Sequence, residues 1–209
     1  GPQSPDWSPD GQWLVFEAGA NIWKIRPDGN DMTQLTFSGR NFFPEWSPDG
    51  QWIAYDRTVP LDSIGIWIMR PDGSEKQKVA SGIFPYWQDS TSLIFVGLHS
   101  EIYKTNLQDS SVTQLTHLNQ ENPIADIRYP AFSPELSQIA FQIQDAASGI
   151  FSIWLMNIDG SNLQKFIEHA SFPEWGPNGN KLIYTDTRRE NGFLWIIDIS
   201  TGDKRQLTN

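Results

Sequence analysis

The sequence is organised around the stretch Phe43-Pro44-Glu45-Trp46-Ser47-Pro48-Asp49-Gly50-Gln51-Trp52-Ile53-Ala54-Tyr55. We interpret it as a short strand that ends at Trp46, a tight turn, and a second strand. Proline fixes φ at a turn position, aspartate can bond to nearby backbone, and glycine accepts a positive φ. The apolar run at residues 52–55 suits a strand that is buried on both faces. The stretch therefore predicts a β-hairpin.

This hairpin recurs along the chain. An aromatic residue stands just before each turn, and these anchor residues are Trp7, Trp46, Trp87, Phe132 and Trp175. They lie 39, 41, 45 and 43 positions apart. Repeats of about 40 residues are typical of four-stranded propeller blades. The sequence therefore predicts an all-β fold, a β-propeller of five four-stranded antiparallel blades.

Each repeat also contains a third strand and a more polar fourth strand. The third strands are expected at residues 22–25, 66–69, 102–104, 153–156 and 194–197. Polar outer strands protect the edge of a sheet from pairing with other sheets. We predict a single propeller domain over residues 1–209, with blades at about 4–36, 43–80, 84–116, 128–167 and 172–208. Residues 1–2, Gly-Pro, are typical of the scar that protease cleavage leaves on an expressed protein.

The repeated motifs resemble a known family. They are Pro-x-Trp-Ser-Pro-Asp-Gly-x-x-Ile-Ala-Tyr at 44–55, Ile-Trp-Ile-Met-x-Pro-Asp-Gly at 66–73, and Gln-Leu-Thr at 34–36, 114–116 and 206–208. Together they resemble the TolB-like propeller repeat, a WD-like repeat rich in Pro-Asp-Gly turns, over residues 4 to 208. The TolB propeller has six blades, whereas five repeats are present here. The resemblance implies a periplasmic or extracellular location.

Composition excludes several classes of partner. The net charge is −10 and the pI is about 4.6, which argues against binding to nucleic acid or to an anionic membrane surface. No apolar run is long enough to span a bilayer, so we predict no membrane insertion. The ten Trp residues follow the repeat, and we interpret them as wedges between blades rather than as carbohydrate-stacking platforms.

Propeller geometry places the connections on two faces. The turns after the first and third strands share one face, and the connections after the second and fourth strands share the other. We call the second face the long-loop face, because it carries most of the length variation and all three histidines. Variable loops on a rigid scaffold usually carry recognition. We therefore predict that a protein or peptide partner binds this face, through His117, Asn119, Ile124, Ile127, Arg128, Tyr129 and Arg40.

A second candidate site is the central channel. The residue before each anchor is expected to lie on the innermost strand, and this set includes Asp6, Glu45, Tyr86 and Glu174. Three acids in equivalent positions could attract a cation or a basic peptide. The alternative is that they bond to backbone or water and have a structural role.

Catalytic motifs are absent from the sequence. There is no Cys, no Gly-x-Ser-x-Gly elbow, no His-Glu-x-x-His pair and no nucleotide-binding glycine loop. We interpret the chain as a non-catalytic scaffold that binds a protein or peptide through its long-loop face and channel mouth, with no cofactor and no metal. It is expected to be oligomeric if five blades do not close a ring. The alternative is a carbohydrate-binding protein or a five-bladed glycosidase that uses the channel carboxylates.

Overall fold

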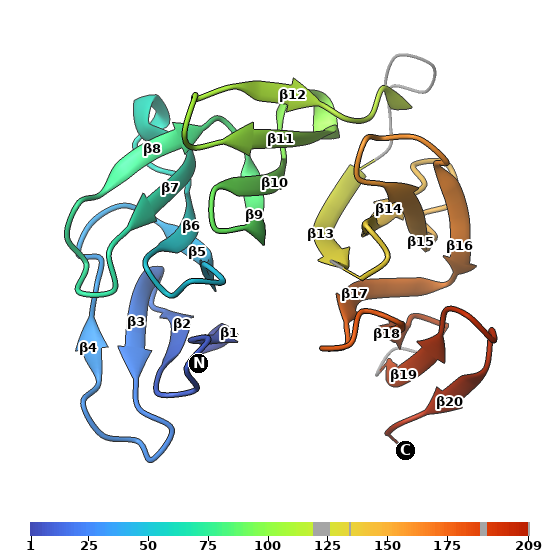
Figure 1. Ribbon diagram of the computed structural model, residues 1–209, viewed down its shortest axis with the longest axis horizontal. Coiled ribbons are helices and arrows are strands. Elements are labelled where there is room, and N and C mark those ends of the chain that lie inside the picture. The colour runs from blue at the N-terminus through green and yellow to red at the C-terminus, as the bar shows by residue number, and fades with distance from the viewer. Residues whose placement is uncertain (119–125, 134, 189–191, 209) are drawn as a thin grey trace. The chain divides into compact units, whose positions relative to one another are not determined.

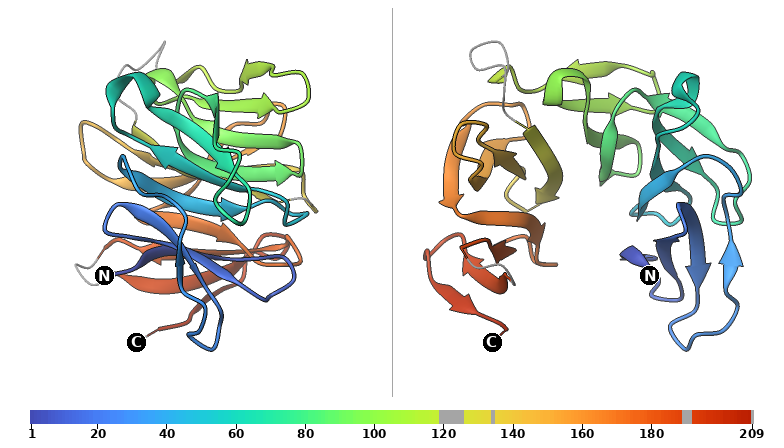
Figure 2. Two further views of the ribbon diagram at one scale, coloured as in Figure 1. Left: turned by 90° about the vertical axis from the view of Figure 1, so that its left-hand side faces the viewer. Right: turned by 180° about the vertical axis from the view of Figure 1, so that it is seen from behind.

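The computed structural model describes residues 1–118, 126–133, 135–188 and 192–208. The chain divides into two compact units. The first contains Gly1–Leu98 and Lys104–Thr113, and the second contains His99–Tyr103 and Gln114–Asn209. The described residues form five four-stranded sheets, and each sheet uses four strands that are consecutive in the chain (Figures 1 and 2). This confirms the predicted fold class, a β-propeller of five four-stranded antiparallel blades.

We number the blades in chain order. Blades 1 and 2 contain β1 (Gln3–Trp7), β2 (Leu14–Ala18), β3 (Asn21–Ile25), β4 (Thr33–Gln34), β5 (Asn41–Trp46), β6 (Ile53–Arg57), β7 (Gly65–Met69) and β8 (Gln77–Ala80). Blade 3 contains β9 (Ile83–Asp89), β10 (Ser92–Val96), β11 (Ile102–Asn106) and β12 (Val112–Gln114). Blades 4 and 5 contain β13 (Asp126–Ser133), β14 (Gln138–Gln144), β15 (Phe151–Asn157), β16 (Gln164–Glu168), β17 (Ala170–Trp175), β18 (Lys181–Asp186), β19 (Phe193–Asp198) and β20 (Lys204–Gln206). In the described part of the chain, 3-10 helices span Leu61–Ser63 and Leu98–Ser100.

The second strand of each blade supplies much of the core. In β6 Ile53, Ala54 and Tyr55 are buried, as the apolar run predicts, and the acid Asp56 that follows is buried as well. In the first unit, Val15, Ile22 and Leu35 of blade 1 pack in one cluster with Trp46 and Tyr55 of blade 2. A strand buried on both faces fixes its own register, since a slip by one residue would move the whole apolar set.

The anchor tryptophans join neighbouring blades. The indole N–H of Trp87 donates to the carbonyl of Glu45 in blade 2, at 3.1 Å. In the second unit, the indole N–H of Trp175 donates to the carbonyl of Ala131 in blade 4, also at 3.1 Å. Both side chains are buried, which confirms the interpretation of these tryptophans as wedges between blades. Trp7, in contrast, is half exposed.

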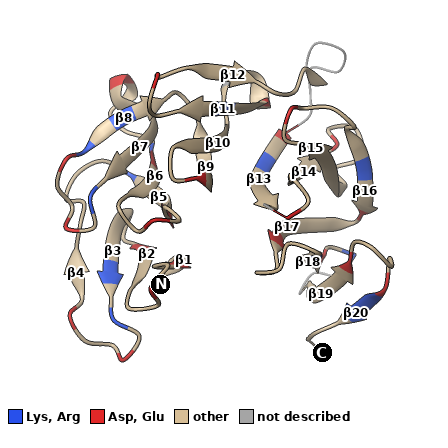
Figure 3. Ribbon diagram, viewed as in Figure 1, with Lys and Arg blue, Asp and Glu red and all other residues tan. Residues whose placement is uncertain are grey.

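The Pro-Asp-Gly turns are held by their own side chains. Ser47 Oγ donates to Asp49 Oδ1 at 2.6 Å, and the same carboxylate accepts the backbone N–H of Gln51 at 3.1 Å. The N–H of Gly50 donates to the carbonyl of Ser47, and Gly50 has φ of +69°. Many acidic residues lie in the connections between strands (Figure 3). The hydrogen bonds of Asp49 therefore stabilise the turn, as the sequence predicts.

Gly50→Ala should destabilise the protein by more than about 1 kcal/mol, because alanine is strained at a positive φ. No neighbouring atom lies closer than 3.8 Å to the added methyl, so the cost would report backbone strain rather than a clash. Gly176→Ala is the matched control, since Gly176 has no positive φ and the nearest atom to its added methyl lies at 3.5 Å. Urea unfolding measures both variants, and equal stabilities for the two would contradict this account.

Trp175→Phe should cost about 1–2 kcal/mol more than Trp46→Phe. Both changes remove similar volume from a buried indole, but only Trp175 loses a hydrogen bond and leaves a carbonyl without its donor. The indole N–H of Trp46 has no hydrogen-bond partner among the described residues, so its removal relieves a buried unpaired donor. Chemical denaturation of the two variants tests this difference, and a greater loss for Trp46→Phe would refute it.

Candidate functional site

A β-bulge interrupts the first strand of every blade. Between the first and second strands the register shifts each time around a residue that precedes proline. The residues before proline all have a positive φ, and they are Ser4 (47°), Phe43 (49°), Phe84 (55°), Tyr129 (53°) and Phe172 (54°). Proline is accepted within a sheet mainly at edges and bulges, which explains why it can stand inside these strands.

The bulge requires an unfavourable backbone conformation. A bulky residue with positive φ is an outlier, and it costs about 1–3 kcal/mol unless its surroundings enforce it. In three blades a polar side chain from the second strand of the preceding blade supports it. The N–H of Phe84 donates to Asp56 Oδ1 at 2.8 Å, and the N–H of Phe172 donates to Gln142 Oε1 at 3.3 Å. The N–H of Phe43 donates to the carboxylate of Glu17 in the same way. We call this contact the bulge clamp.

The bulges bring aromatic rings together within each unit. In the first unit the rings of Phe43 and Phe84 pack edge to face, with centroids 4.7 Å apart. In the second unit the rings of Tyr129 and Phe172 are tilted by 41°, with centroids 4.8 Å apart. Phe172 remains 55% exposed, although its backbone is strained. The second unit therefore presents an aromatic surface that the fold holds in place.

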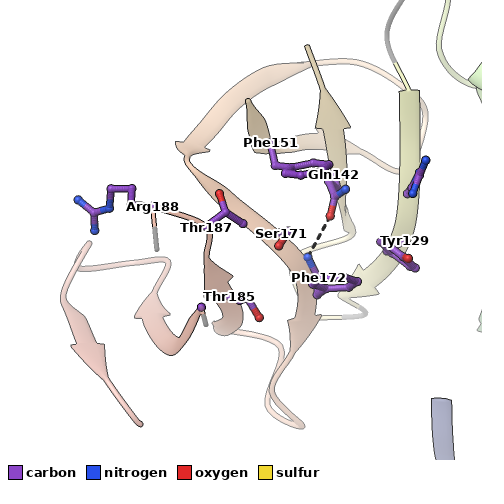
Figure 4. A pocket seen from close by; sticks show the side chains of 10 residues that line it. Tyr129, Gln142, Phe151, Ser171, Phe172, Thr185, Thr187 and Arg188 are labelled. Atoms are coloured by element: carbon purple, nitrogen blue, oxygen red, sulfur yellow. Dashed lines mark hydrogen bonds between the residues drawn. The ribbon is translucent and has the colours of Figure 1, made fainter. Parts of the chain in front are cut away.

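A pocket of about 580 Å³ lies beside this surface in the second unit (Figure 4). Its lining comes from the first halves of β13, β15 and β17, from the ends of β14 and β18, and from the connection that follows β18. The lining residues are Arg128, Tyr129, Gln142, Phe151, Ser171, Phe172, Thr185, Thr187, Arg188 and Gly192. All these segments border connections after second and fourth strands, so the pocket belongs to the long-loop face.

Two arginines in the pocket lining are each held by an aspartate two residues earlier. Arg128 donates to Asp126 Oδ2 through Nε at 2.9 Å and Nη2 at 2.5 Å. Arg188 donates through Nε to both oxygens of Asp186 at 3.0 Å, and also through Nη2. These hydrogen bonds lower the pKa of Asp186 and raise that of Arg128. In both pairs the bonds to the aspartate run through Nε and Nη2, which fixes the guanidinium plane, and the Arg128 side chain also hydrogen-bonds Tyr129.

The sequence-predicted partner-binding residues are placed unevenly. Arg128 and Tyr129 line the pocket, and His117 and Arg40 are exposed. Ile127 is fully buried in β13, so its side chain is not part of the accessible surface. Asn119 and Ile124 lie outside the described residues. Partner binding by this set stays a prediction.

The channel residues are divided between the units. Asp6, Glu45 and Tyr86 belong to the first unit and Glu174 to the second, so the channel that they were predicted to line stays a prediction. Asp6 accepts the backbone N–H of Trp46 at 2.7 Å. That contact joins blade 1 to blade 2, which matches the structural alternative for this acid.

Three acids of the first unit have raised pKa values because they are buried. Burial raises the pKa of Asp6 to about 6, and hydrogen bonds from the N–H groups of Trp46 and Trp7 limit the rise. Burial also raises the pKa of Glu17, and it raises that of Asp56 well above its ordinary value. The charge of Glu17 adds to the effect on Asp56. Among the described residues, no group of three His, Asp or Glu side chains is placed to hold a metal ion.

Sequence reasoning missed Phe172 and Gln142, although a signal was present. An aromatic residue precedes proline at 43–44, 84–85, 129–130 and 172–173, always two residues before the position that precedes the anchor. The anchor residues belong to a long motif, so they are easier to recognise in the sequence than this repeat of only two residues. The partner of each bulge has no common sequence signal, because the residue type at the clamp position varies: two acids, an amide, a hydroxyl and an aliphatic residue, at Glu17, Asp56, Gln142, Thr185 and Val96.

Comparison with solved structures identifies the class of fold. The chain has a TolB-like β-propeller fold. It superposes on a putative TolB from Agrobacterium tumefaciens with a TM-score of 0.82 and 20% identity, over 98% of this chain and 79% of that one. TolB from Acinetobacter baumannii gives a TM-score of 0.81 and 21% identity, over 100% of this chain and 54% of that one. An oligogalacturonate lyase in complex with manganese gives 0.65 and 21%, over 97% and 63% of the two chains.

The sequence relatives, like the solved structures, include TolB proteins and an oligogalacturonate lyase. An uncharacterised protein of Agrobacterium fabrum, Atu1656, is 24% identical over 87% of this chain. The Tol-Pal system protein TolB of Albidiferax ferrireducens is 25% identical over 49% of the chain, and the oligogalacturonate lyase of Dickeya dadantii is 26% identical over 72%. The chain spans 64%, 25% and 42% of these relatives' lengths, respectively. No family model matches the chain. Within the described residues no helix is long and apolar enough to cross a membrane.

Asp6→Asn should remove part of the pH dependence of stability. Aspartate in an unfolded chain titrates near 3.9, so between about pH 4 and pH 6 the folded protein holds a proton that the unfolded chain releases. The stabilisation is complete below pH 4 and is lost as the pH rises through 6. From pH 4 to pH 7 the parent should lose up to about 3 kcal/mol more than the variant, whose amide oxygen can still accept the Trp46 N–H.

Urea unfolding of both proteins at several pH values gives this difference directly. Glu17 and Asp56 titrate in both proteins, so their contributions cancel in the comparison. Parallel stability curves for the two proteins would contradict the assignment to Asp6.

Proposed function

We propose that the chain is a non-catalytic TolB-like propeller scaffold that binds a protein or peptide partner through the long-loop face of its second unit. The observation that carries this proposal is Phe172. Its ring is 55% exposed on a backbone with φ of +54°, next to proline. The positive φ recurs in every blade and belongs to the fold, whereas Phe172 is the exposed one of the four aromatic residues at this position. An exposed aromatic ring beside a pocket is typical of an interaction surface.

The surroundings of Phe172 support a protein partner. Interface hot spots are enriched in aromatic residues and arginine, and here Tyr129, Arg128 and Arg188 line the same pocket. The lining is also firmly held, because the clamp fixes Phe172 and the aspartates fix both arginine forks. A preorganised surface loses little conformational freedom on binding. The likeness to TolB proteins supports this class of function, and it supports a periplasmic or extracellular location as part of the proposal.

A second candidate function is carbohydrate binding or cleavage. The observation in its favour is the likeness to oligogalacturonate lyases, in sequence over 72% of the chain and in fold. The channel carboxylates Asp6, Glu45 and Glu174 were the residues predicted for such a role. Stabilisation of the protein by oligogalacturonate in a thermal-shift assay, together with turnover of that substrate, would favour this function over a scaffold.

Phe172→Asn should weaken partner binding at least tenfold, which is about 1.4 kcal/mol. Asparagine accepts a positive φ better than most residues, so the variant removes the ring and keeps the bulge. The partner is first trapped by a photo-crosslinking amino acid at position 172 and identified by mass spectrometry. Binding of the purified partner to the parent and to the variant is then measured by calorimetry.

The control lies on the opposite face of the same unit. Asp159 is exposed in the turn between β15 and β16, and its carboxylate accepts hydrogen bonds from Ser161. A crosslinker at position 159 should not trap the protein that is trapped from position 172. Equal trapping from both positions, or undiminished affinity of Phe172→Asn, would show that the long-loop face is not the binding surface.

A further inference from the structure

Gln142 presents an unused hydrogen-bond donor to the pocket. Its side chain is only 2% exposed, and its Oε1 accepts the N–H of Phe172 at 3.3 Å. A backbone N–H requires an acceptor, so this bond fixes which end of the amide is oxygen. The amide nitrogen is therefore the end that remains for a ligand (Figure 4), and it has no acceptor among the described residues. A donor that lines a pocket and has no protein acceptor can donate to a ligand that enters the pocket.

The rest of the pocket lining is also rich in donors. Nη1 of Arg128 and of Arg188 makes no hydrogen bond to the aspartate, although the Arg128 side chain also hydrogen-bonds Tyr129. The described lining residues include no carboxylate. The hydroxyls of Ser171, Thr185 and Thr187 make no hydrogen bond to described residues, and they can donate or accept. Because each arginine is paired with an aspartate, the pocket has an excess of donor groups rather than of positive charge. Its chemistry suits a ligand with an excess of acceptors.

The geometry points to an extended acidic peptide segment as the ligand of this pocket, with an apolar side chain on the Tyr129–Phe172 rings and carboxylates at the arginines. This inference rests on the proposed function and names the partner's chemistry. Arg188 and Tyr129 lie at opposite sides of the pocket, with Phe172 and Gln142 between them (Figure 4). Tyr129 adjoins Arg128 in the chain, so an apolar group at the centre would have a guanidinium toward each side.

A peptide fits this lining better than a glycan does. Thr185 and Thr187 are two residues apart in the sequence. Along an extended peptide the groups on one side also recur every second residue, so the two spacings match. A sugar hydroxyl is both donor and acceptor, and a neutral glycan would leave the excess of donors unmatched. Peptide carbonyls could accept from Gln142 Nε2 while side-chain carboxylates accept from Nη1 of the arginines, as charge-assisted hydrogen bonds.

The experiment uses synthetic peptides of defined sequence and one substitution at the clamp position. The substitution introduces a residue type that already occupies this position in the first unit. Fluorescein-labelled peptides carry one Leu between two Asp, with one to three Ser as spacers on either side. Control peptides replace Asp by Asn. The protein variant is Gln142→Glu, which keeps an acceptor for the Phe172 N–H and replaces the amide donor by a carboxylate. Glu17 and Asp56 show that a carboxylate serves as a bulge clamp. Glu17→Gln is the matched control, since it makes the reverse exchange in the first unit.

Fluorescence anisotropy at pH 8 should show binding of at least one Asp peptide and at least tenfold weaker binding of its Asn counterpart. Gln142→Glu should weaken the Asp peptide at least tenfold, and Glu17→Gln should leave it unchanged. Arg128→Gln is a second variant in case Gln142→Glu does not fold, because Asp126 is 41% exposed and would stay hydrated. It should weaken binding at least fivefold and reduce the dependence on salt.

Three results would overturn the inference: equal binding of Asp and Asn peptides, undiminished binding by both pocket variants, or binding of oligogalacturonate but of no peptide. If no peptide binds while the crosslinked partner still depends on Phe172, the acidic segment is wrong and the proposed function stands. If Phe172→Asn also leaves partner binding intact, both are wrong.

Discussion

The bulge clamp is the interaction on which the rest of this structure depends. A residue before proline takes a left-handed conformation in the first strand of each blade, and in three blades a polar side chain from the preceding blade accepts its N–H. The contact joins neighbouring sheets through backbone rather than through side-chain packing alone. Without the bulge the proline could not stand inside a strand, and without an acceptor the N–H would be buried unpaired.

The same contact links the fold to the candidate site. Gln142 is at once the clamp for Phe172 and a donor in the pocket lining, so one side chain serves two neighbouring needs. In the first unit the equivalent residues Glu17 and Asp56 are carboxylic acids with raised pKa values. The N–H groups of Phe43 and Phe84 therefore meet an acid, whereas that of Phe172 meets a neutral amide. Repeats with nearly identical hairpins can therefore present different chemistry at equivalent positions.

Much of the fold could be predicted from the sequence, because the hairpin of residues 43–55 is local and recurs. Pro48, Asp49 and Gly50 determine a turn by short-range chemistry, and the buried run of β6 follows from composition. The candidate site could be predicted only in part. The place of Arg128 and Tyr129 beside a long connector predicts their position at the site. The contact of Gln142 with Phe172, in contrast, joins residues 30 positions apart. Such contacts leave no periodic pattern.

Pro173 has a consequence for the kinetics of recognition. Its ring restricts the backbone of Phe172, the bulge fixes the direction of the aromatic ring, and the clamp holds the remaining N–H. A partner would therefore meet a surface that is already in its bound shape, and docking would require no ordering of the backbone around this ring. Association with such a surface is limited by diffusion and orientation, so differences in affinity among related partners would appear mainly as differences in residence time.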